Sequence, residues 1–135
     1  KNNILIKLDL KGFPKKSTHA FHIHEAGDLS DNSCASACAH FNPYNKKHGG
    51  IKSKERHVGD LGNIKSDANG CIKTEIIDNQ IKLRGTKANI IGRSVVIHEN
   101  QDDNGLGGFP DSLTTGHAGK RLCCAVIGYS KKMFN

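Results

Sequence analysis

Tryptophan is absent from this sequence, other aromatic residues are few, and no apolar run is long. Aromatic residues make up 5% and hydrophobic residues 36% of the 135 residues. No segment has the run of about 20 apolar residues that a membrane-spanning helix requires, so we expect no membrane segment. No long window has the period of an amphipathic helix, and Lys1 does not begin a signal-peptide pattern. These absences argue against a membrane protein and a helical bundle.

The sequence has an excess of positive charge. Lys and Arg number 20 against 13 Asp and Glu, which gives a formal net charge of +7 at pH 7. Such a balance raises the question of a nucleic-acid partner. However, the lysines are scattered, few aromatic residues lie among them, and no DNA- or RNA-binding motif is present. We therefore expect no nucleic-acid partner and a basic surface that attracts a small anion.

Short alternating segments and frequent turns predict an all-β fold. In Ile4–Leu10 every second residue is apolar, which is typical of a half-buried strand. Strands are expected at residues 4–10, 19–24, 72–76, 81–83, 92–98 and 122–129, with long loops at 25–60 and 99–119. We see no internal repeat and no second domain. The pattern predicts a single domain over residues 1–135, built as a β-sandwich or Greek-key β-barrel with two long functional loops.

Six of the eight histidines lie between His19 and Asp60. Phe-His-Ile-His at residues 21–24 alternates apolar and imidazole side chains, so on a strand His22 and His24 share one face. Two imidazoles side by side are a poor choice for packing and a good choice for binding a metal. Further along, the long loop carries candidate ligands at spacings of 8, 9 and 3 residues: His40, His48, His57 and Asp60. A metal ion could draw these side chains together and fix the loop.

Several motifs now appear in one order along the chain. They are FHIHE at residues 21–25, HFNP at 40–43, KHGG at 47–50, RHVGDLGN at 56–63, GRSVVIHE at 92–99, TGHAGKRLCC at 115–124 and VIGY at 126–129. This pattern resembles the copper-zinc superoxide dismutase family, from Ile4 to about Tyr129. The resemblance implies an enzyme that converts two superoxide radicals to O2 and H2O2 by cycling copper between Cu(II) and Cu(I), beside a structural zinc site.

The resemblance also implies a role for each site residue. The expected copper ligands are His22, His24, His40 and His98. The expected zinc ligands are His40, His48, His57 and Asp60. His40 would bridge the metals, leave copper during turnover and take up a proton. Arg121 would orient superoxide, the carboxylate of Asp102 would join His22 to His48, and Thr115 would narrow the channel.

Five cysteines leave at least one unpaired. The resemblance implies a disulfide bond between Cys34 and Cys124, which would join the first long loop to a late strand. Cys38, Cys71 and Cys123 have no role in the family pattern. We expect each of them to be a small buried or half-buried residue. Cys38 is also close enough in sequence to Cys34 to compete for Cys124 by exchange.

Two histidines and two loop positions depart from the metal pattern. His19 is expected to be structural, with its ring bonded to backbone near the loop. His117 stands where the family usually carries Asn and is expected at the rim of the site. Asn100 and Thr114 stand at positions where the family pattern has lysines that are thought to steer superoxide. We therefore expect activity with an altered salt dependence.

The resemblance implies eight strands, and this sequence starts where the third would begin, so we expect free sheet edges. It also implies a homodimer that uses residues 90–93 and 126–128, and a copper chaperone as a possible partner. We expect a cytoplasmic location, with secretion as the alternative if an N-terminal segment was removed.

Two other functions are compatible with parts of this pattern. One is a non-catalytic module that binds or transfers copper on the same fold. Such modules typically lose a copper ligand or the arginine, whereas this sequence retains both. The other is a domain stabilised by zinc alone, which would not need His22, His24 and His98 together.

Overall fold

The computed structural model describes residues 3–134. The strands of this part of the chain are β1 (Ile4–Leu10), β2 (Thr18–His24), β3 (Asp60–Lys65), β4 (Ile72–Asp78), β5 (Ser94–His98) and β6 (Arg121–Val126). Two short 3-10 helices accompany them, η1 (Ala35–Ala37) and η2 (Lys131–Phe134). The prediction of an all-β fold is therefore confirmed, and the element bounds show where the sequence pattern was incomplete.

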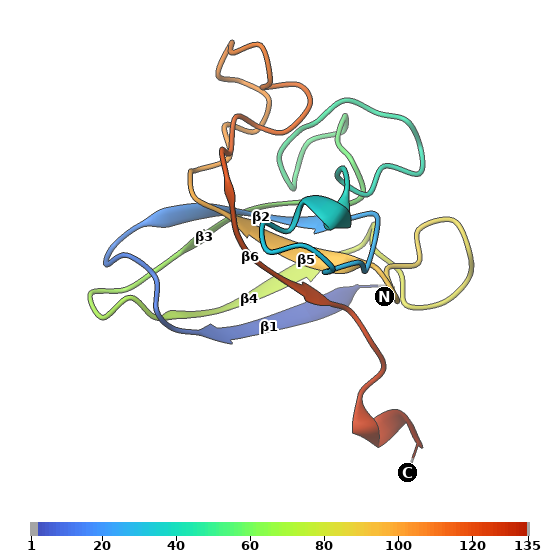
Figure 1. The fold of residues 1–135 in the computed structure, drawn as a ribbon. Helices are drawn as coiled ribbons and strands as arrows, with labels where there is room; N and C mark the ends of the chain where they lie inside the picture. The colour runs from blue at the N-terminus through green and yellow to red at the C-terminus, as the bar shows by residue number, and fades with distance from the viewer. Residues whose placement is uncertain (1–2, 135) are drawn as a thin grey trace.

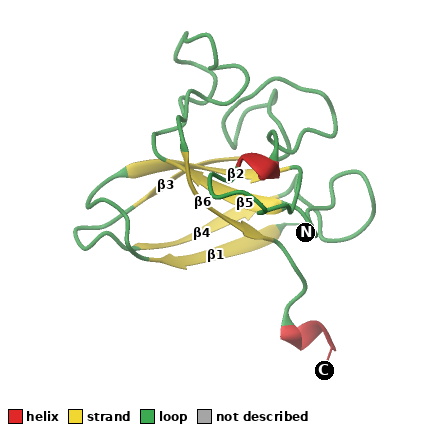
Figure 2. Cartoon of the chain, viewed as in Figure 1, coloured by secondary structure: helices red, strands yellow, loops and turns green. Residues whose placement is uncertain are grey.

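The strands form two antiparallel sheets (Figures 1 and 2). One sheet pairs β1 with β4, and the other has the order β3-β2-β5-β6. The chain leaves the larger sheet after β3, pairs β4 with β1, and returns to place β5 beside β2. Both long loops extend from the larger sheet on the side away from β1 and β4 (Figure 1). This arrangement brings the candidate ligands of the loops to one side of the molecule.

The core lies between the two sheets because strands β1 to β5 each turn apolar side chains inward. The alternation in β1 is visible as half-buried residues at every second position. On the larger sheet, Phe21, Ile23 and Ile97 are at most 5% exposed. Other members of the same buried cluster are Phe41, Val58, Leu61, Ile64, Ile72, Ile81, Ala88 and Ile90. Residues just outside the strands, such as Phe41 and Val58, therefore tie the first long loop to the core.

The predicted strand at residues 81–83 is wrong. Lys82 forms an isolated bridge with Asn89 and no ladder. The backbone N–H of Ile81 instead donates a hydrogen bond to the Asp78 carboxylate, 3.0 Å away. Lys82 exchanges backbone hydrogen bonds with Ala88 and Ile90. The segment therefore meets a neighbouring stretch at one bridge only and forms no strand.

Strand β3 was missed because its sequence does not alternate. Leu61 and Ile64 are both buried although they are three residues apart. Gly62 has a φ of +80°, a conformation that glycine adopts without steric cost. The pairing of β2 with β3 also shifts register between Ala20 and His22. A bulge of this kind removes the period-2 signal that a strand prediction relies on.

Each sheet has two edge strands without a further strand partner within residues 3–134. β1 and β4 pair only with each other, β3 pairs only with β2, and β6 pairs only with β5. Leu122 and Val126 on β6 are 47% and 49% exposed. The expectation of free edges is thus met in the part of the chain that the structure describes.

No helix among the described residues combines the length and the apolar character that crossing a membrane would need.

Candidate metal centre

The strand pair β2 and β5 forms the base of the site. His22 and His24 on β2 share one face, as expected, and are 0% and 1% exposed. The intervening Phe21 and Ile23 belong to the apolar core. His98 ends β5, which pairs antiparallel with β2. The sheet thus supplies three buried imidazoles beneath the two long loops.

The first group of donors, the four-histidine group, consists of His22, His24, His40 and His98. Each offers one ring nitrogen, and these four atoms lie within 4.8 Å of one another. The side chains are at most 4% exposed. Nδ1 of His22 and Nε2 of the other three are buried without a hydrogen-bond partner. Buried polar atoms normally have partners, so this arrangement fits a metal ion.

Hydrogen bonds on the opposite ring nitrogens orient these imidazoles. Nε2 of His22 lies 2.6 Å from Oδ2 of Asp102. Nδ1 of His24 lies 2.7 Å from the Cys38 carbonyl oxygen, and Nδ1 of His98 lies 3.3 Å from that of Gly119. Such partners fix the tautomer and the direction of the ring, which leaves the other nitrogen of each ring for a metal.

The second group, the Asp60 group, consists of His40, His48, His57 and Asp60. Oδ1 of Asp60 lies 3.0 Å from Nδ1 of His40, 3.0 Å from Nδ1 of His48 and 3.1 Å from Nδ1 of His57. Nδ1 of His40 and Nδ1 of His57 are 3.2 Å apart. Ligands held about 2.0 Å from a tetrahedral zinc ion lie about 3.3 Å from one another. The three distances from Asp60 and the distance between His40 and His57 therefore match the spacing of ligands in a tetrahedral site.

His22 also lies near the Asp60 group. One of its ring nitrogens is within 4.8 Å of donor atoms of His40, His48 and Asp60. However, its Nε2 is engaged by Asp102, and its Nδ1 is the atom left for the four-histidine group. Nδ1 of His57 is 3.1 Å from Asp60. The geometry therefore favours His57 as the fourth member.

Asp102 lies between the two groups. Its Oδ2 is 2.6 Å from Nε2 of His22, and its Oδ1 is 2.8 Å from Nε2 of His48. The backbone of Asp102 is held on both sides by the Asn63 side chain, at 2.7 and 3.0 Å. One carboxylate thus fixes an imidazole of each group, and Asn63 is a supporting residue that the sequence analysis missed.

Burial and the neighbouring charges set the protonation of the centre. Burial, assisted by His40, lowers the pKa of His22 to about 3 and that of His24 to about 2. Burial also lowers the pKa of His98 to about 4. For His48, burial acts in the same direction, but hydrogen bonds with Asp102 and Asp60 outweigh it and raise the pKa to about 9. The four-histidine group is therefore neutral at pH 7, as metal ligation requires.

The two carboxyl groups are ionised at the same pH. Burial disfavours the charge on Asp60, but hydrogen bonds from three imidazoles hold its pKa far below the usual range. Asp102 is similar, because hydrogen bonds with His22 and His48 overcome burial and lower its pKa to about 2. A negative charge is thus available in the Asp60 group and beside both groups.

We expect the free energy of unfolding of the metal-free protein to fall as the pH is lowered from 7 to 5. Histidine has a pKa near 6.5 in the unfolded chain, so the unfolded state takes up protons that buried His22, with a pKa of about 3, does not. One such histidine costs about 2 kcal/mol over this range. The raised pKa of His48 acts in the opposite direction, but the lowered values outnumber it. Urea unfolding at pH 7, 6 and 5 measures the change, and constant or rising stability would contradict it.

A disulfide bond joins the first long loop to β6, as the resemblance implied. Cys34 and Cys124 are bonded, with Cα atoms 6.1 Å apart across 90 residues of sequence. The carbonyl oxygen of Cys34 accepts a hydrogen bond from Nη1 of Arg121 at 2.7 Å. Arg121 also lies opposite His98 in the pairing of β5 with β6. The cross-linked loop therefore fixes the guanidinium beside the four-histidine group.

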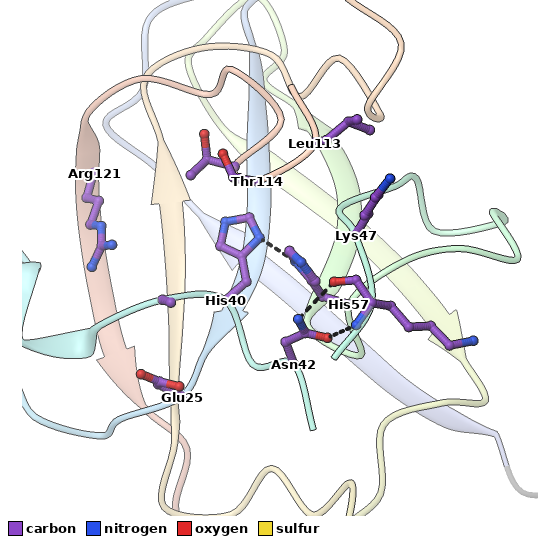
Figure 3. A pocket seen from close by; sticks show the side chains of 11 residues that line it. Glu25, His40, Asn42, Lys47, His57, Leu113, Thr114 and Arg121 are labelled. Carbon is purple, nitrogen blue, oxygen red and sulfur yellow. Dashed lines mark hydrogen bonds between the residues drawn. The ribbon is translucent and has the colours of Figure 1, made fainter. Parts of the chain in front are cut away.

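A cavity of about 720 Å³ opens over the centre. His40, which belongs to both donor groups, lines this cavity. His57 of the Asp60 group and Arg121 of β6 line it as well. Figure 3 shows His40 between Arg121 on one side and His57 on the other. Thr115 lines the same cavity, and its hydroxyl lies 3.3 Å from the Asp111 carbonyl oxygen. The cavity gives a small molecule access to the metal groups.

A buried ion pair beneath the first long loop was not found from the sequence. Arg56 is 2% exposed and Asp78 is 5% exposed. Nη1 of Arg56 lies 2.7 Å from Oδ1 of Asp78. The same guanidinium donates to the carbonyl oxygens of Ile51, His57 and Val58. In a basic chain, nothing in the sequence distinguishes one arginine that is buried in an ion pair from the exposed ones.

The two remaining histidines lie outside both donor groups. Nδ1 of His19 is 2.8 Å from the His98 carbonyl oxygen, so its ring is bonded to backbone as expected. His117 is exposed, bonded to Asp111 at 2.7 Å and stacked on Phe109.

The expectation for the free cysteines is partly wrong. Cys71 is half-buried, but Cys38 and Cys123 are exposed. Cys38 follows η1 on the loop surface, and Cys123 lies on β6, which has a free edge among the described residues.

Comparison with known proteins agrees with this geometry. Residues 1–127 match the family model described as copper/zinc superoxide dismutase. The chain is 57% identical over 133 residues to a superoxide dismutase [Cu-Zn] of Paramecium bursaria Chlorella virus 1, covering 98% of this chain and 70% of the relative. It is 50% identical over 125 residues to the superoxide dismutase [Cu-Zn] of Yarrowia lipolytica, covering 93% and 80%. It is 49% identical over 126 residues to the extracellular superoxide dismutase [Cu-Zn] of Drosophila melanogaster, covering 93% and 68%. The chain therefore belongs to the copper/zinc superoxide dismutase family.

Proposed function

We propose that this protein is a superoxide dismutase, which converts two superoxide ions and two protons into one O2 and one H2O2. The proposed copper ligands are His22, His24, His40 and His98. The proposed zinc ligands are His40, His48, His57 and Asp60. The observation that carries the proposal is that each residue of the four-histidine group turns one buried, unpartnered ring nitrogen toward the others.

The chemistry of the donors assigns the two metals. Zinc readily accepts a carboxylate beside imidazoles, and a closed set of four protein ligands is typical of a structural zinc site. This supports zinc in the Asp60 group. Imidazole donors alone suit copper, which supports copper in the four-histidine group. Copper, when bound there, supplies the one-electron oxidation and reduction that dismutation requires.

The residues around the cavity bind the substrate and supply a proton. Arg121 carries a permanent charge and several N–H donors, so it can hold the superoxide anion beside the four-histidine group. Its hydrogen bond to Cys34 limits where the guanidinium can lie. His40 lines the cavity, and its Nε2 has no hydrogen-bond partner. That atom can hold a proton and deliver it to the product. Thr115 lines the cavity from the second long loop and limits the space available to the substrate.

A non-catalytic copper-binding or copper-transfer module is not favoured. Such a module does not need a guanidinium held at a cavity beside the copper donors, and here Arg121 is held there by Cys34. A domain stabilised by zinc alone does not explain the convergent nitrogens of the four-histidine group.

Elemental analysis of the purified protein, paired with a superoxide-decay assay before and after copper loading, tests the function. We expect about one copper and one zinc per chain, with a decay rate that rises as copper is added. Zinc alone, with no decay after copper has been supplied, would overturn the enzyme and favour the binding module.

We also propose a homodimer that uses residues 90–93 and 126–128. These two segments lie side by side, joined by two backbone hydrogen bonds. The N–H of Gly92 donates to the Ile127 carbonyl oxygen at 2.7 Å, and the N–H of Ile127 donates to the Arg93 carbonyl oxygen at 2.8 Å. They offer one continuous patch with apolar members, as an interface with C2 symmetry would need. Light scattering at micromolar concentration that gives the mass of one chain would remove this proposal.

For the compartment we propose the cytoplasm, with secretion as the alternative. Two observations support the alternative of secretion: a disulfide bond is more typical of secreted proteins, and one relative is named extracellular. Fractionation of the source cells distinguishes the two. A copper chaperone as partner remains a prediction, which the copper content of protein made with and without such a partner would test.

A further inference from the structure

The cavity over the metal centre carries positive charge from two directions. Arg121 lines it from β6, and Lys46 and Lys47 line it from the first long loop. Glu25 is the one acidic side chain among the described residues that line it. Figure 3 shows Arg121 and Lys47 on opposite sides of His40. An anion that enters this cavity therefore meets more positive than negative groups before it reaches His40.

The second long loop contributes no charge to the cavity wall. Its lining residues are Leu113, Thr114 and Thr115. Thr114 and Asn100 stand where the family pattern has steering lysines. Thr114 lines the cavity, whereas Asn100 does not. Among the residues that line the cavity, positive charge besides that of Arg121 therefore comes from the first long loop.

The turn that carries the two lysines is anchored while their side chains stay exposed. The N–H of Lys46 donates to the Asn42 side chain at 2.9 Å, and the Asn42 amide donates back to the Lys46 carbonyl at 2.9 Å. The N–H of Lys47 donates to the Glu55 carboxylate at 2.8 Å. Both side chains are exposed, and within residues 3–134 neither ammonium forms an ion pair. The charges are thus held near the cavity without being neutralised.

We propose that Lys46 and Lys47 collect superoxide at the cavity and supply the steering charge that the second loop lacks. This inference rests on the proposed function. Clefts lined by charge of one sign focus the field and raise association rates by about 10- to 1000-fold, an effect for which this enzyme family is itself an established example. Salt screens exposed charges beyond about 8–10 Å, so the contribution of the two lysines decreases as ionic strength rises.

The test compares two double variants that remove the same charge from the same loop. K46Q/K47Q removes both lysines from the cavity wall, and K52Q/K54Q removes two lysines that do not line it. At low ionic strength we expect K46Q/K47Q to lower kcat/KM for superoxide at least about threefold and to weaken its salt dependence. K52Q/K54Q should change kcat/KM by less than about 1.5-fold. Equal losses in both variants, or no loss in K46Q/K47Q, would overturn the proposal.

Azide binding to the copper(II) protein gives a readout that does not depend on turnover. Its affinity, followed by visible absorption at low salt, should fall at least about twofold in K46Q/K47Q and stay unchanged in K52Q/K54Q. Copper and zinc contents should be equal in all three proteins. If the wild-type holoprotein consumes no superoxide, the proposed function fails, while the azide comparison still decides whether the lysines collect anions. Equal azide affinities in the two variants would overturn their role.

Discussion

Replacing His40 with alanine should lower the rate of superoxide decay by at least about 100-fold and reduce the content of both metals. His40 belongs to both donor groups, with its Nε2 in the four-histidine group and its Nδ1 3.0 Å from Asp60. Losing a residue that merely supports a metal ligand costs about 10- to 100-fold in affinity or activity. Loss of a ligand shared by two sites should cost more. Elemental analysis and superoxide decay measure the two effects.

The matched control for this variant is His117→Ala. His117 is exposed and bonded to Asp111, and it belongs to neither donor group. Its removal should leave the metal contents unchanged and the decay rate within about twofold of wild type. Thermal unfolding of the metal-free proteins shows whether His40→Ala is folded. A folded His40→Ala protein with normal copper, zinc and decay rate would contradict the assignment of His40.

Replacing Arg56 with methionine should destabilise the protein by about 3–5 kcal/mol, because it leaves the buried Asp78 charge unpaired. Arg56 contacts both carboxylate oxygens of Asp78, at 2.7 and 3.3 Å. It also donates to the carbonyl oxygens of His57 and Val58. Urea unfolding of the metal-free protein measures the loss of stability.

The same change should also weaken zinc binding, since Arg56 fixes the backbone at His57. Competition with a chelator measures the zinc affinity. The control is Arg84→Met, which removes an exposed arginine and should change stability by less than about 0.5 kcal/mol. If both variants were equally stable, the buried pair would not hold the loop.

The sequence predicted a strand correctly where neighbouring residues alternate between apolar and polar, and failed where this alternation is interrupted or misleading. The alternation in Ile4–Leu10 predicted β1 correctly because a strand's period of two is a local property. Strand β3 was missed because Gly62 and the shift between Ala20 and His22 disrupt that period. The segment at residues 81–83 is an error of the opposite kind. Its residues alternate like a strand, but Ile81 is bonded to the Asp78 carboxylate and Lys82 forms only an isolated bridge.

For the candidate site, the donor residues and the pairing of neighbours on a strand could be predicted from the sequence. His22 and His24 face the same side because they are two residues apart on β2. The spacing of imidazole and carboxylate side chains on the first long loop then supplied His40, His48, His57 and Asp60 as candidates. The family resemblance added His98. Residue types and spacings of this kind are encoded locally, so they can be found without coordinates.

Contacts between residues far apart in the sequence could not be predicted from local residue patterns and became visible in the folded chain. Asp102 lies between His22 and His48, at sequence separations of 80 and 54 residues. Arg56 reaches Asp78 across 22 residues, and Lys46 and Lys47 line the same cavity as Arg121. These contacts depend on how the sheets pack and how the Cys34–Cys124 bond closes the loop. Such long-range closure follows from the packing of the whole chain, and no local pattern of residues encodes it.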